Sequence, residues 1–350
     1  MSATTFNELR EKYKVNGNNR ILKTNLLPLD IILGGGLKEG SIYEIHSPSG
    51  VGKSTIAIQI CKNLIKAYDD YNVFYIDADA ASYELVNRHG IDKQPDRFIY
   101  SNINKYEELD ELTDTIISND DLNIKLLVID TITMVTSENY QTKPITNIYT
   151  DLEESKYSTR YLKKYKNLFN AKGITVILLN QERVDISGVQ VEFCQKVFRA
   201  AGAKIIKYAP DTIIRLNEGD AISVNKNIMG NYQEVKIGHK LKITAKKNKR
   251  AIPNVTIETP FMFGNGILNH MFMANILTDH KHVIVGRKSE NKEGSETPYK
   301  TSILGEDQAF MGKKSFNDWV KDKYDDLYKI LNDDGKLQLI PTKNKEISKE

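Results

Sequence analysis

The stretch from Ser41 to Ala67 constrains the fold of this chain more than any other. It opens with an alternating strand pattern at 42–45, continues through the turn SPSGVGKS, and ends in an amphipathic helical pattern. Strand, glycine turn, Gly-Lys-Ser and helix, in this order, form the context of a phosphate-binding P-loop. The stretch therefore predicts that the chain binds a nucleoside triphosphate.

The residue types in this turn explain how a phosphate would be held. Gly50 and Gly52 let backbone N–H groups converge on phosphate oxygens, and the N-terminus of the following helix adds its dipole. Lys53 can reach the β- and γ-phosphates, and the Ser54 hydroxyl can bind Mg²⁺. Ser47 departs from the motif, which usually begins with Gly or Ala. The alternative, a glycine-rich turn with a chance lysine, is disfavoured by the flanking pattern. The candidate cofactor-binding residues of the turn are consecutive: Ser49, Gly50, Val51, Gly52, Lys53, Ser54 and Thr55.

Length and composition set the remaining bounds. The 350 residues are 40% hydrophobic and 27% charged, as in an ordinary globular protein with one large core. A net charge of +3 is nearly neutral, so any basic surface for nucleic acid must be local. Cys61 and Cys194 share no metal-binding spacing, which favours reduced thiols. The absence of a long apolar run or a signal segment leads us to expect a soluble, cytoplasmic protein without a membrane partner.

Strands and helices alternate through the first two thirds of the chain. Apolar strand patterns lie at 42–45, 72–77, 97–100, 124–130 and 174–180, and helical patterns lie at 53–67, 83–88, 106–118 and 155–171. This alternation predicts an α/β fold with a doubly wound, mostly parallel sheet. From about Asp211 the strand patterns TIIRL, QEVKI, KLKITAKK and NVTIETPFMF follow one another without helices, which predicts an antiparallel extension.

Four regions are expected along the chain. Residues 1–25 contain a capping box and a short helical pattern followed by a polar linker, and they could dock on the core or on a neighbouring subunit as a polymerisation element. Residues 26–263 form the ATPase core. Residues 264–331 form a small C-terminal α/β segment with a helix at 315–331, and 332–350 form a polar tail.

Carboxylates and amides follow three of the predicted strands. Asp130 ends a nearly continuous apolar run, as a Walker B aspartate does, and would bind Mg²⁺ beside Ser54. Asp77 and Asp79 end another strand, and Asp79 faces the nucleotide crevice if Asp77 points away. Asp79 could then polarise the attacking water, although both aspartates could instead cap the next helix. Gln181 follows a third strand and could sense the γ-phosphate.

The ordered set of these patterns resembles the RecA-type homologous recombinases, in a divergent, phage-like form. The resemblance runs from about Leu26 to Phe263 and weakly on to Leu331. Its carriers are LPLDIILGGGLKEGSIYEI, PSGVGKST, FYIDADAASY, LLVIDTITMV, ITVILLNQERV and KITAKKNKRAIP. The resemblance implies a RecA-like P-loop NTPase fold with ATP and Mg²⁺ as cofactors.

The resemblance also implies roles for single residues around the nucleotide. Asp79 stands where the family usually has a catalytic glutamate, and this shorter side chain leaves the hydrolysis rate in question. Gln181 matches the glutamine that relays nucleotide state to the DNA-binding loop. Tyr83 lies near the family's adenine-stacking aromatic, in a segment that is one residue shorter. Lys247 and Lys249 match a lysine pair that reaches the nucleotide of the neighbouring subunit. A solvated basic hairpin is the alternative reading of those lysines.

DNA contacts are expected from two loops, at 138–154 and 182–204. Basic and aromatic residues alternate in the second loop, which suits phosphate contact and base stacking on single-stranded DNA; they are Phe193, Lys196, Phe198, Arg199 and Gly202. A disordered surface loop is the alternative. Lys156 and Lys163 fall where the family has DNA-contacting arginines, and lysine lacks the planar fork of arginine.

The leading functional hypothesis is an ATP-dependent DNA recombinase with Mg²⁺-dependent, DNA-stimulated ATPase activity. It would form helical filaments on single-stranded DNA and catalyse homologous pairing and strand exchange with double-stranded DNA. Mediator and single-strand-binding proteins are possible partners. A hexameric replicative helicase on the same fold and an accessory ATPase that modulates recombination remain alternatives.

Overall fold

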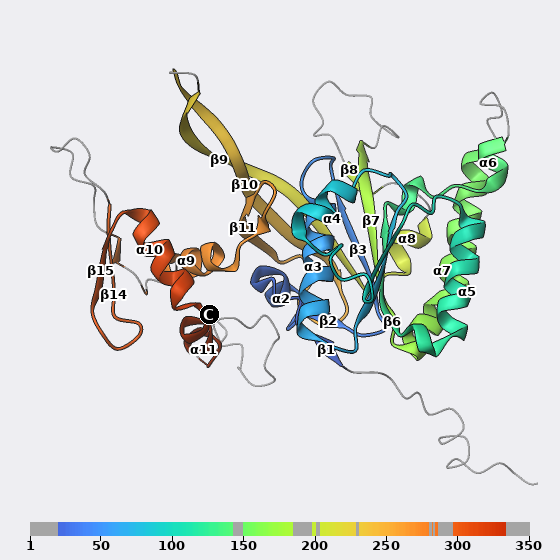
Figure 1. The fold of residues 1–350 in the computed structure, drawn as a ribbon, viewed down its shortest axis with the longest axis horizontal. Coiled ribbons are helices and arrows are strands. Elements are labelled where there is room, and N and C mark those ends of the chain that lie inside the picture. Colours follow the sequence, from blue (N-terminus) through green and yellow to red (C-terminus); the bar gives the residue numbers. More distant parts are fainter. Residues whose placement is uncertain are drawn as a thin grey trace, which may run out of the picture.

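A computed structural model describes residues 20–142, 150–184, 198–200, 204–228, 231–279, 282, 284–285 and 297–333. Its main feature is one ten-stranded sheet in the order β12-β11-β10-β9-β3-β7-β6-β4-β5, with β8 attached to β7 (Figure 1). The strands of this sheet are β3 (Ile42–Ser47), β4 (Asn72–Asp77), β5 (Phe98–Ser101), β6 (Ile124–Asp130), β7 (Thr175–Val184), β8 (Phe198–Ala200), β9 (Thr212–Ile228), β10 (Asn231–Asn248), β11 (Thr256–Met262) and β12 (Gly266–Ile267).

The sheet has a parallel half and an antiparallel half. Strands β5, β4, β6, β7, β3 and β9 pair in parallel, whereas β9, β10, β11 and β12 pair antiparallel. Central strands such as β6 are apolar along nearly their whole length because both faces of the parallel half are covered. The predicted doubly wound sheet with an antiparallel extension is therefore confirmed.

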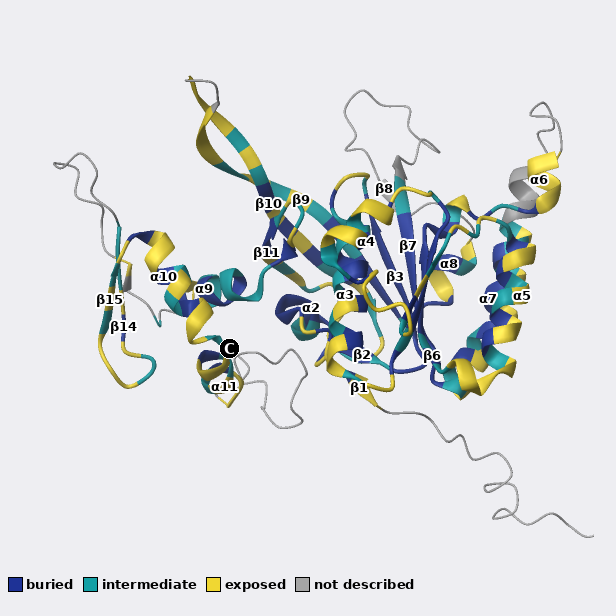
Figure 2. Cartoon of the chain, viewed as in Figure 1, coloured by how far each residue is buried: buried dark blue, intermediate teal, exposed yellow. Residues whose placement is uncertain are grey.

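Helices cover both faces of the parallel half and bury it in two clusters of apolar side chains (Figure 2). One face carries α2 (Leu27–Ile32), α3 (Lys53–Ala67) and α4 (Tyr83–His89). The other carries α5 (Tyr106–Ser118), α7 (Thr150–Lys172) and α8 (Lys204–Tyr208). Among the described residues, no helix has the length and apolarity needed to cross a bilayer.

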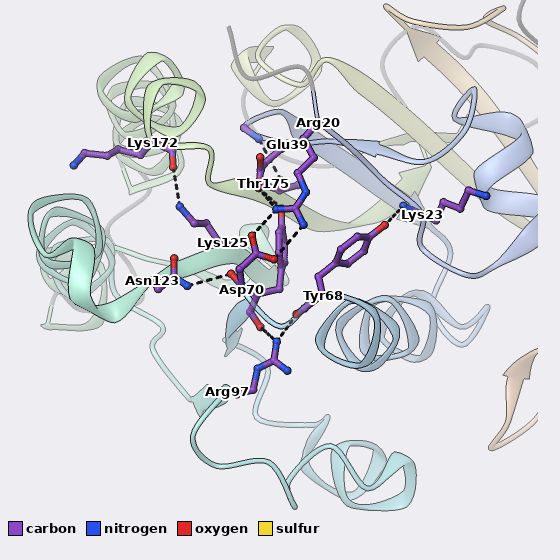
Figure 3. Close-up of polar contacts among 12 residues, drawn as sticks. Arg20, Lys23, Glu39, Tyr68, Asp70, Arg97, Asn123, Lys125, Lys172 and Thr175 are labelled. Carbon is purple, nitrogen blue, oxygen red and sulfur yellow. Dashed lines mark hydrogen bonds and ion pairs between the residues drawn. The ribbon is translucent and has the colours of Figure 1, made fainter. Parts of the chain in front are cut away.

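Polar contacts at the amino edge of the sheet anchor the first described residues (Figure 3). Arg20 forms an ion pair with Asp70, which lies between α3 and β4, and its guanidinium lies over the Tyr68 ring. The Tyr68 hydroxyl accepts a hydrogen bond from the backbone N–H of Lys23 at 2.8 Å. Within the predicted linker, β1 (Ile21–Leu22) also pairs with β2 (Leu37–Lys38). The chain is thus fixed to the core from residue 20 onward.

The antiparallel half differs from the sequence prediction in two strands, because β9 also continues beyond the TIIRL pattern to Ile228. The patterns QEVKI and KLKITAKK belong to one long strand, β10, which forms a hairpin with β9 that projects beyond the sheet (Figure 1). Gly238 interrupts the apolar pattern but not the strand. A Cβ there would lie 2.2 Å from the Phe261 carbonyl oxygen, so glycine is needed for the close approach of β11.

The boundaries of two predicted helices and of one predicted loop also change. The predicted first loop at 138–154 contains α6 (Glu138–Thr142) and the first turn of α7, which begins at Thr150 and not at Ser155. The predicted helix at 315–331 is two helices, α10 (Gly312–Asp322) and α11 (Tyr324–Asp333). Apolar periodicity continues across the break at Lys323, which is why the sequence suggests a single helix. The predicted N-terminal helix lies outside the described residues, as does the tail beyond 333.

The C-terminal segment has its own buried cluster, which includes Phe272, Phe316 and Leu327. It is made of α9 (Asn269–Asp279), α10, α11 and a small sheet of β13 (Ile284–Val285), β14 (Pro298–Thr301) and β15 (Gln308–Met311). Leu27 of α2 joins this cluster and so connects the segment to the core.

Candidate nucleotide site

The glycine turn between β3 and α3 has the backbone of a phosphate cradle. Gly50 and Gly52 have φ angles of +79° and +111°, a region that other residues rarely adopt. A Cβ on Gly52 would also lie 2.4 Å from the Phe261 ring. Gly52 provides no side-chain cap to α3, so the first-turn amides of α3 face the turn. Both glycines are therefore required by the conformation and, at Gly52, by the space.

Lys53 is buried at the start of α3 and folds back over the turn. Its Nζ donates hydrogen bonds to the Ser47 hydroxyl at 3.1 Å, the Ser47 carbonyl at 3.3 Å and the Pro48 carbonyl at 3.2 Å. Ser47, the residue that departs from the usual motif, thus supplies an extra acceptor to the lysine. Burial lowers the pKa of Lys53, and the carboxylates of Asp130, Asp79 and Glu182 oppose that shift.

Asp130 ends β6 beside the turn and is buried. Its Oδ2 accepts hydrogen bonds from the Tyr75 hydroxyl at 2.6 Å and the Ser82 hydroxyl at 3.1 Å. Burial raises the pKa of Asp130, while hydrogen bonds from Tyr75 and from Ser54 act in the opposite direction. The structure therefore brings together Ser54 and Asp130, the two predicted Mg²⁺ ligands.

The two aspartates after β4 have different environments. Asp77 is fully buried and accepts hydrogen bonds from the Ser82 N–H at the start of α4, at 2.6 Å, and from the Tyr100 hydroxyl. Asp79 is only partly buried, and the Thr131 hydroxyl lies 3.4 Å from it. Burial, followed by the Asp130 and Asp77 carboxylates, raises the pKa of Asp79, and Lys53 opposes this. Asp77 thus serves the helix terminus, whereas Asp79 lies on the side of Lys53 and Asp130.

Gln181 and Tyr83 lie on elements that border the turn. Gln181 of β7 pairs in register with Ser47 of β3. Tyr83, the first residue of α4, is 57% exposed, and its ring centroid lies 5.5 Å from that of Tyr100. The structure therefore leaves Tyr83 accessible to a ligand.

Sequence reasoning missed an aromatic stack on the other side of the turn. The Phe261 ring contacts the Gly52 position and stacks on His239, with ring centroids 5.1 Å apart. Phe263 follows, 46% exposed and with its centroid 5.7 Å from that of His239. Phe261 and Phe263 lie two residues apart in one predicted strand pattern, which was a visible signal, but only the pairing of β10 with β11 brings His239 beside them.

The chemistry of these side chains fits a magnesium nucleotide. The Ser54 hydroxyl and the Asp130 carboxylate are oxygen donors, which Mg²⁺ prefers. Burial, followed by the nearby Asp130 carboxylate, raises the pKa of Asp79, and a cation between Asp79 and Asp130 would relieve the repulsion between the two carboxylates. The described residues contain no group of three His, Cys, Asp or Glu side chains that could hold a metal without further ligands. A shared site, completed by phosphate oxygens and water, is what these donors suit.

Lys247 and Lys249 lie at the opposite edge of the sheet. β10 ends beside the start of β9, where Thr212 pairs with both Asn248 and Tyr43. Four strand residues, about 13 Å, separate Tyr43 from Ser47 at the turn. The Lys247 Nζ donates to the carbonyls of Tyr208 and Pro210, at 3.0 and 2.6 Å, and the Lys249 Nζ contacts Asp211 at 2.6 Å. The structure therefore does not bring this lysine pair to Lys53 of the same subunit.

The predicted DNA-binding residues fall into two groups. Lys156 and Lys163 are exposed on α7 and, with Arg160 between them, line an open groove of about 720 Å³. Lys164, also on this groove, is paired with Asp110 and Asp114 of α5. The second group lies in the 182–204 segment. Phe193, Lys196 and Gly202 lie outside the described residues, and only the backbone is described for Phe198 and Arg199, on β8.

Comparisons of the sequence with known proteins point to one family. The family model described as the RecA N-terminal domain matches residues 8–268. Protein RecA of Cutibacterium acnes is 27% identical over 248 residues, which cover 70% of this chain and 66% of the relative. Protein RecA of Streptomyces venezuelae is 25% identical over 307 residues, covering 87% of this chain and 73% of the relative. Protein RecA of Allorhizobium ampelinum is 27% identical over 268 residues, covering 73% and 67%. The chain thus spans about two thirds to three quarters of the length of these relatives.

Proposed function

The chain belongs to the RecA family, and from this premise we propose that it is an ATP-dependent DNA recombinase. It assembles on single-stranded DNA in the cytoplasm and pairs that strand with homologous double-stranded DNA. The observation that carries the proposal is the meeting of Lys53, Ser54, Asp79 and Asp130 at one edge of the sheet.

Each residue of this edge has a defined task in ATP hydrolysis. ATP supplies the phosphoanhydride bond, and Ser54 and Asp130 would hold a Mg²⁺ ion that neutralises phosphate charge. When ATP binds, the Lys53 ammonium group exchanges its hydrogen bonds with Ser47 and Pro48 for contacts with the phosphates. The Asp79 carboxylate orients the attacking water and accepts its proton. Because burial raises the pKa of Asp79, its carboxylate is a stronger base than an exposed aspartate.

Two exposed aromatic rings support a position for the base of the nucleotide. Tyr83 of α4 and Phe263, which follows β11, flank the turn from two sides and are both partly exposed. An adenine needs a flat apolar contact more than a polar one, and aromatic faces provide it. We assign the base contact to these rings, with Tyr83 as the residue expected from the sequence.

Assembly of a head-to-tail filament would complete the site. Lys247 and Lys249 are too far from their own phosphate cradle to act there, but an interface between unlike surfaces can place them on that of a neighbour. Two cations on the γ-phosphate would stabilise the charge that develops in the transition state. DNA would bind along α7 through Lys156 and Lys163 and along the 182–204 segment. Fixing the rotation between subunits in this way would make hydrolysis depend on DNA.

Electron microscopy and a strand-exchange assay together test this function. The full chain is mixed with single-stranded DNA and a non-hydrolysable ATP analogue, and is then assayed with ATP, Mg²⁺ and homologous duplex. Helical filaments and joint molecules are the expected results. Closed rings that unwind forked DNA would identify a helicase of the same fold. DNA-stimulated hydrolysis without joint molecules would identify an accessory ATPase.

A further inference from the structure

Glu182 is a buried carboxylate to which the nucleotide chemistry above gives no role. Its side chain is 0% exposed, although it carries a charge that is costly to bury. Its Oε1 accepts hydrogen bonds from His46 Nδ1 at 2.8 Å and Arg215 Nε at 2.7 Å, and its Oε2 accepts one from Arg215 Nη2 at 2.9 Å. The guanidinium therefore binds the carboxylate through two parallel contacts, the most directional form of an ion pair.

These three residues come from three adjacent strands. His46 of β3 pairs in register with Asn180 of β7 on one side and with Arg215 of β9 on the other. Glu182, two residues after Asn180, closes the row by bonding to both partners. The row lies directly before Ser47, where the phosphate turn begins. Any shift of β7 relative to that turn would have to stretch these contacts.

Glu182 also marks the point at which β7 leaves the main sheet. Gln181 is the last residue of β7 that pairs with β3, and Glu182 is the first that pairs with β8, opposite Ala200. The clamped carboxylate thus separates the part of β7 beside the nucleotide turn from the part that continues into the 182–204 segment. Glu182 is also close enough to Lys53 to oppose the lowering of the lysine pKa.

We propose that Glu182, held by Arg215 and His46, is a positioning residue that transmits nucleotide binding to the β7–β8 arm. The proposal rests on the proposed function, because the arm belongs to the segment assigned to DNA. When the phosphates draw Lys53 away from the turn, Glu182 loses a nearby positive charge. The ion pair between Glu182 and Arg215 then keeps Gln181 fixed relative to the turn. The end of β7 and the turn therefore move together.

Glu44 is a second buried carboxyl group nearby, and it has no arginine partner among the hydrogen bonds described for it. Burial of a glutamate at this place therefore does not by itself require a pair such as that of Glu182 with Arg215. Glu44 is also fully buried on β3, and its Oε1 accepts a hydrogen bond from Asn180 at 2.9 Å. Burial raises the pKa of Glu44 to about 7, so this group avoids part of the cost by taking up a proton. Glu182 instead has an arginine partner, which binds its carboxylate through two contacts. Glu44 is therefore the matched control for the replacement of a buried carboxyl group without loss of the clamp.

The experiment measures coupling between nucleotide and DNA in the full chain. Affinity for a labelled single-stranded oligonucleotide is compared with and without a non-hydrolysable ATP analogue, for the wild type, Glu182→Gln, Arg215→Lys and Glu44→Gln. Glutamine keeps the shape of Glu182 but not its charge, and lysine keeps the charge of Arg215 but not its fork. The nucleotide-dependent gain in DNA affinity should fall about tenfold in both clamp variants, within the usual range of coupling between two sites. Glu44→Gln should keep the gain, even if it changes the melting temperature.

A second readout needs no DNA. Amide hydrogen exchange of residues 182–184 and 198–200 is measured with and without the analogue, together with analogue affinity. The wild type should show a nucleotide-dependent change in this arm, and Glu182→Gln should lose it while still binding the analogue. A change that persists in Glu182→Gln, or is lost equally in Glu44→Gln, overturns the inference. If the exchange change depends on Glu182 but the wild type shows no nucleotide-linked DNA binding, the proposed function fails and the positioning role stands.

Discussion

The two ends of strand β3 differ in how their charges are arranged. At its carboxyl end lies the nucleotide edge, formed by the 47–54 turn with Asp79 and Asp130, where burial and neighbouring carboxylates raise the pKa of both aspartates. At its amino end, Lys247 and Lys249 are already bound to backbone carbonyls and to Asp211. The first edge is preorganised for a cation and a phosphate. The second must release its lysines before they can act on anything else.

This difference explains why one subunit would need another. A site that contains its phosphate cradle but not its additional cations can bind nucleotide without hydrolysing it quickly. The sheet separates the two halves by about 13 Å, the length of four strand residues. The side chains of Lys247 and Lys249 would have to turn around and cross this distance to reach the turn of their own subunit, and no side-chain movement achieves both.

Removing the lysine of the nucleotide edge should have the largest effect. Lys53→Ala removes the cation that the buried cradle positions, and ATP hydrolysis should fall about a thousandfold or more, as for other cations on a transferred phosphoryl group. Turnover is measured with saturating DNA, and circular dichroism checks folding. Lys66→Ala, at the other end of α3, is the control and should hydrolyse ATP normally. Normal turnover in Lys53→Ala would remove the basis of the nucleotide edge.

Asp79→Asn tests whether that edge supplies the base. Turnover should fall about a hundredfold or more, the usual contribution of a general base, while nucleotide binding is kept or strengthened because a negative charge beside the phosphates is lost. Steady-state kinetics and a fluorescent nucleotide analogue measure the two quantities. If turnover survives in Asp79→Asn and is lost in Asp77→Asn in a folded protein, the two aspartates have been assigned the wrong way round.

The pH dependence of the same variant has a defined sign. The pKa of Asp79 is raised on folding, so its protonated form is favoured in the native state. The stability it contributes is present at low pH and is lost as pH rises through the raised pKa. Nucleotide-free Asp79→Asn should therefore melt at a higher temperature than the wild type at neutral pH and show little difference at low pH.

The double variant Lys247→Ala with Lys249→Ala tests the other edge. It should bind nucleotide normally, because Lys53 and Ser54 remain. It should lose DNA-stimulated turnover by about a hundredfold, as when a positioned stabiliser of transition-state charge is removed. Turnover with and without single-stranded DNA gives the comparison. Loss of nucleotide binding in the absence of DNA would mean that the lysines serve their own subunit.

Mixing variants separates the two edges directly. Lys53→Ala lacks a working cradle, and the double lysine variant lacks the cations of the opposite edge. In a mixed filament, some interfaces join an intact cradle to intact lysines, so part of the activity should return. Co-assembly is checked independently by crosslinking. If mixtures that co-assemble never exceed the sum of the two proteins alone, the two edges do not meet across an interface.

The nucleotide edge was readable from sequence because its parts are local. The turn at 47–54 and the apolar strand before Asp130 can each be recognised from a few consecutive residues. The predicted strand boundaries at 72–77 and 124–130 match the structure. The sequence could not decide between Asp77 and Asp79. Two residues that are two positions apart would share one face of a continued strand, but β4 ends at Asp77 and the chain turns before Asp79. The contacts with Ser82 and Tyr100 show that Asp77 binds the start of the next helix.

Features that depend on strand pairing were not readable. The Glu182 clamp needs the registers of β9, β3 and β7 at once, and the Phe261–His239 stack needs that of β10 and β11. The single long strand β10 was divided because Gly238 resembles a turn until its contact with Phe261 is known. The phage-like character of the family resemblance and the roles of the 185–197 segment stay predictions, the latter because this segment lies outside the described residues.

The smallest effect on DNA-stimulated turnover should come from Asp211→Asn. The sign of this effect shows whether Asp211 restrains Lys249 or orients it before subunits assemble. Asp211 pairs with Lys249, with side chains 25% and 54% exposed. Its other oxygen lies 3.3 Å from the Ile42 N–H, and the asparagine carbonyl could still accept that bond. A pair this exposed contributes at most about 1 kcal/mol, a factor of about five in an equilibrium.

If Asp211 restrains Lys249 until assembly, the variant should reach half-maximal DNA-stimulated turnover at up to about fivefold lower protein concentration. If Asp211 instead holds Lys249 in the geometry that a neighbouring phosphate requires, the same variant should need more protein and reach a lower maximum. We expect the first result, because Lys249 now points its ammonium at a carboxylate of its own chain, a contact that a phosphate would have to replace. Asp220→Asn, which breaks the exposed pair with Lys240 on the projecting hairpin, is the control for a lost surface ion pair. Equal effects of Asp211→Asn and Asp220→Asn would show that general charge, and not release of Lys249, sets the threshold.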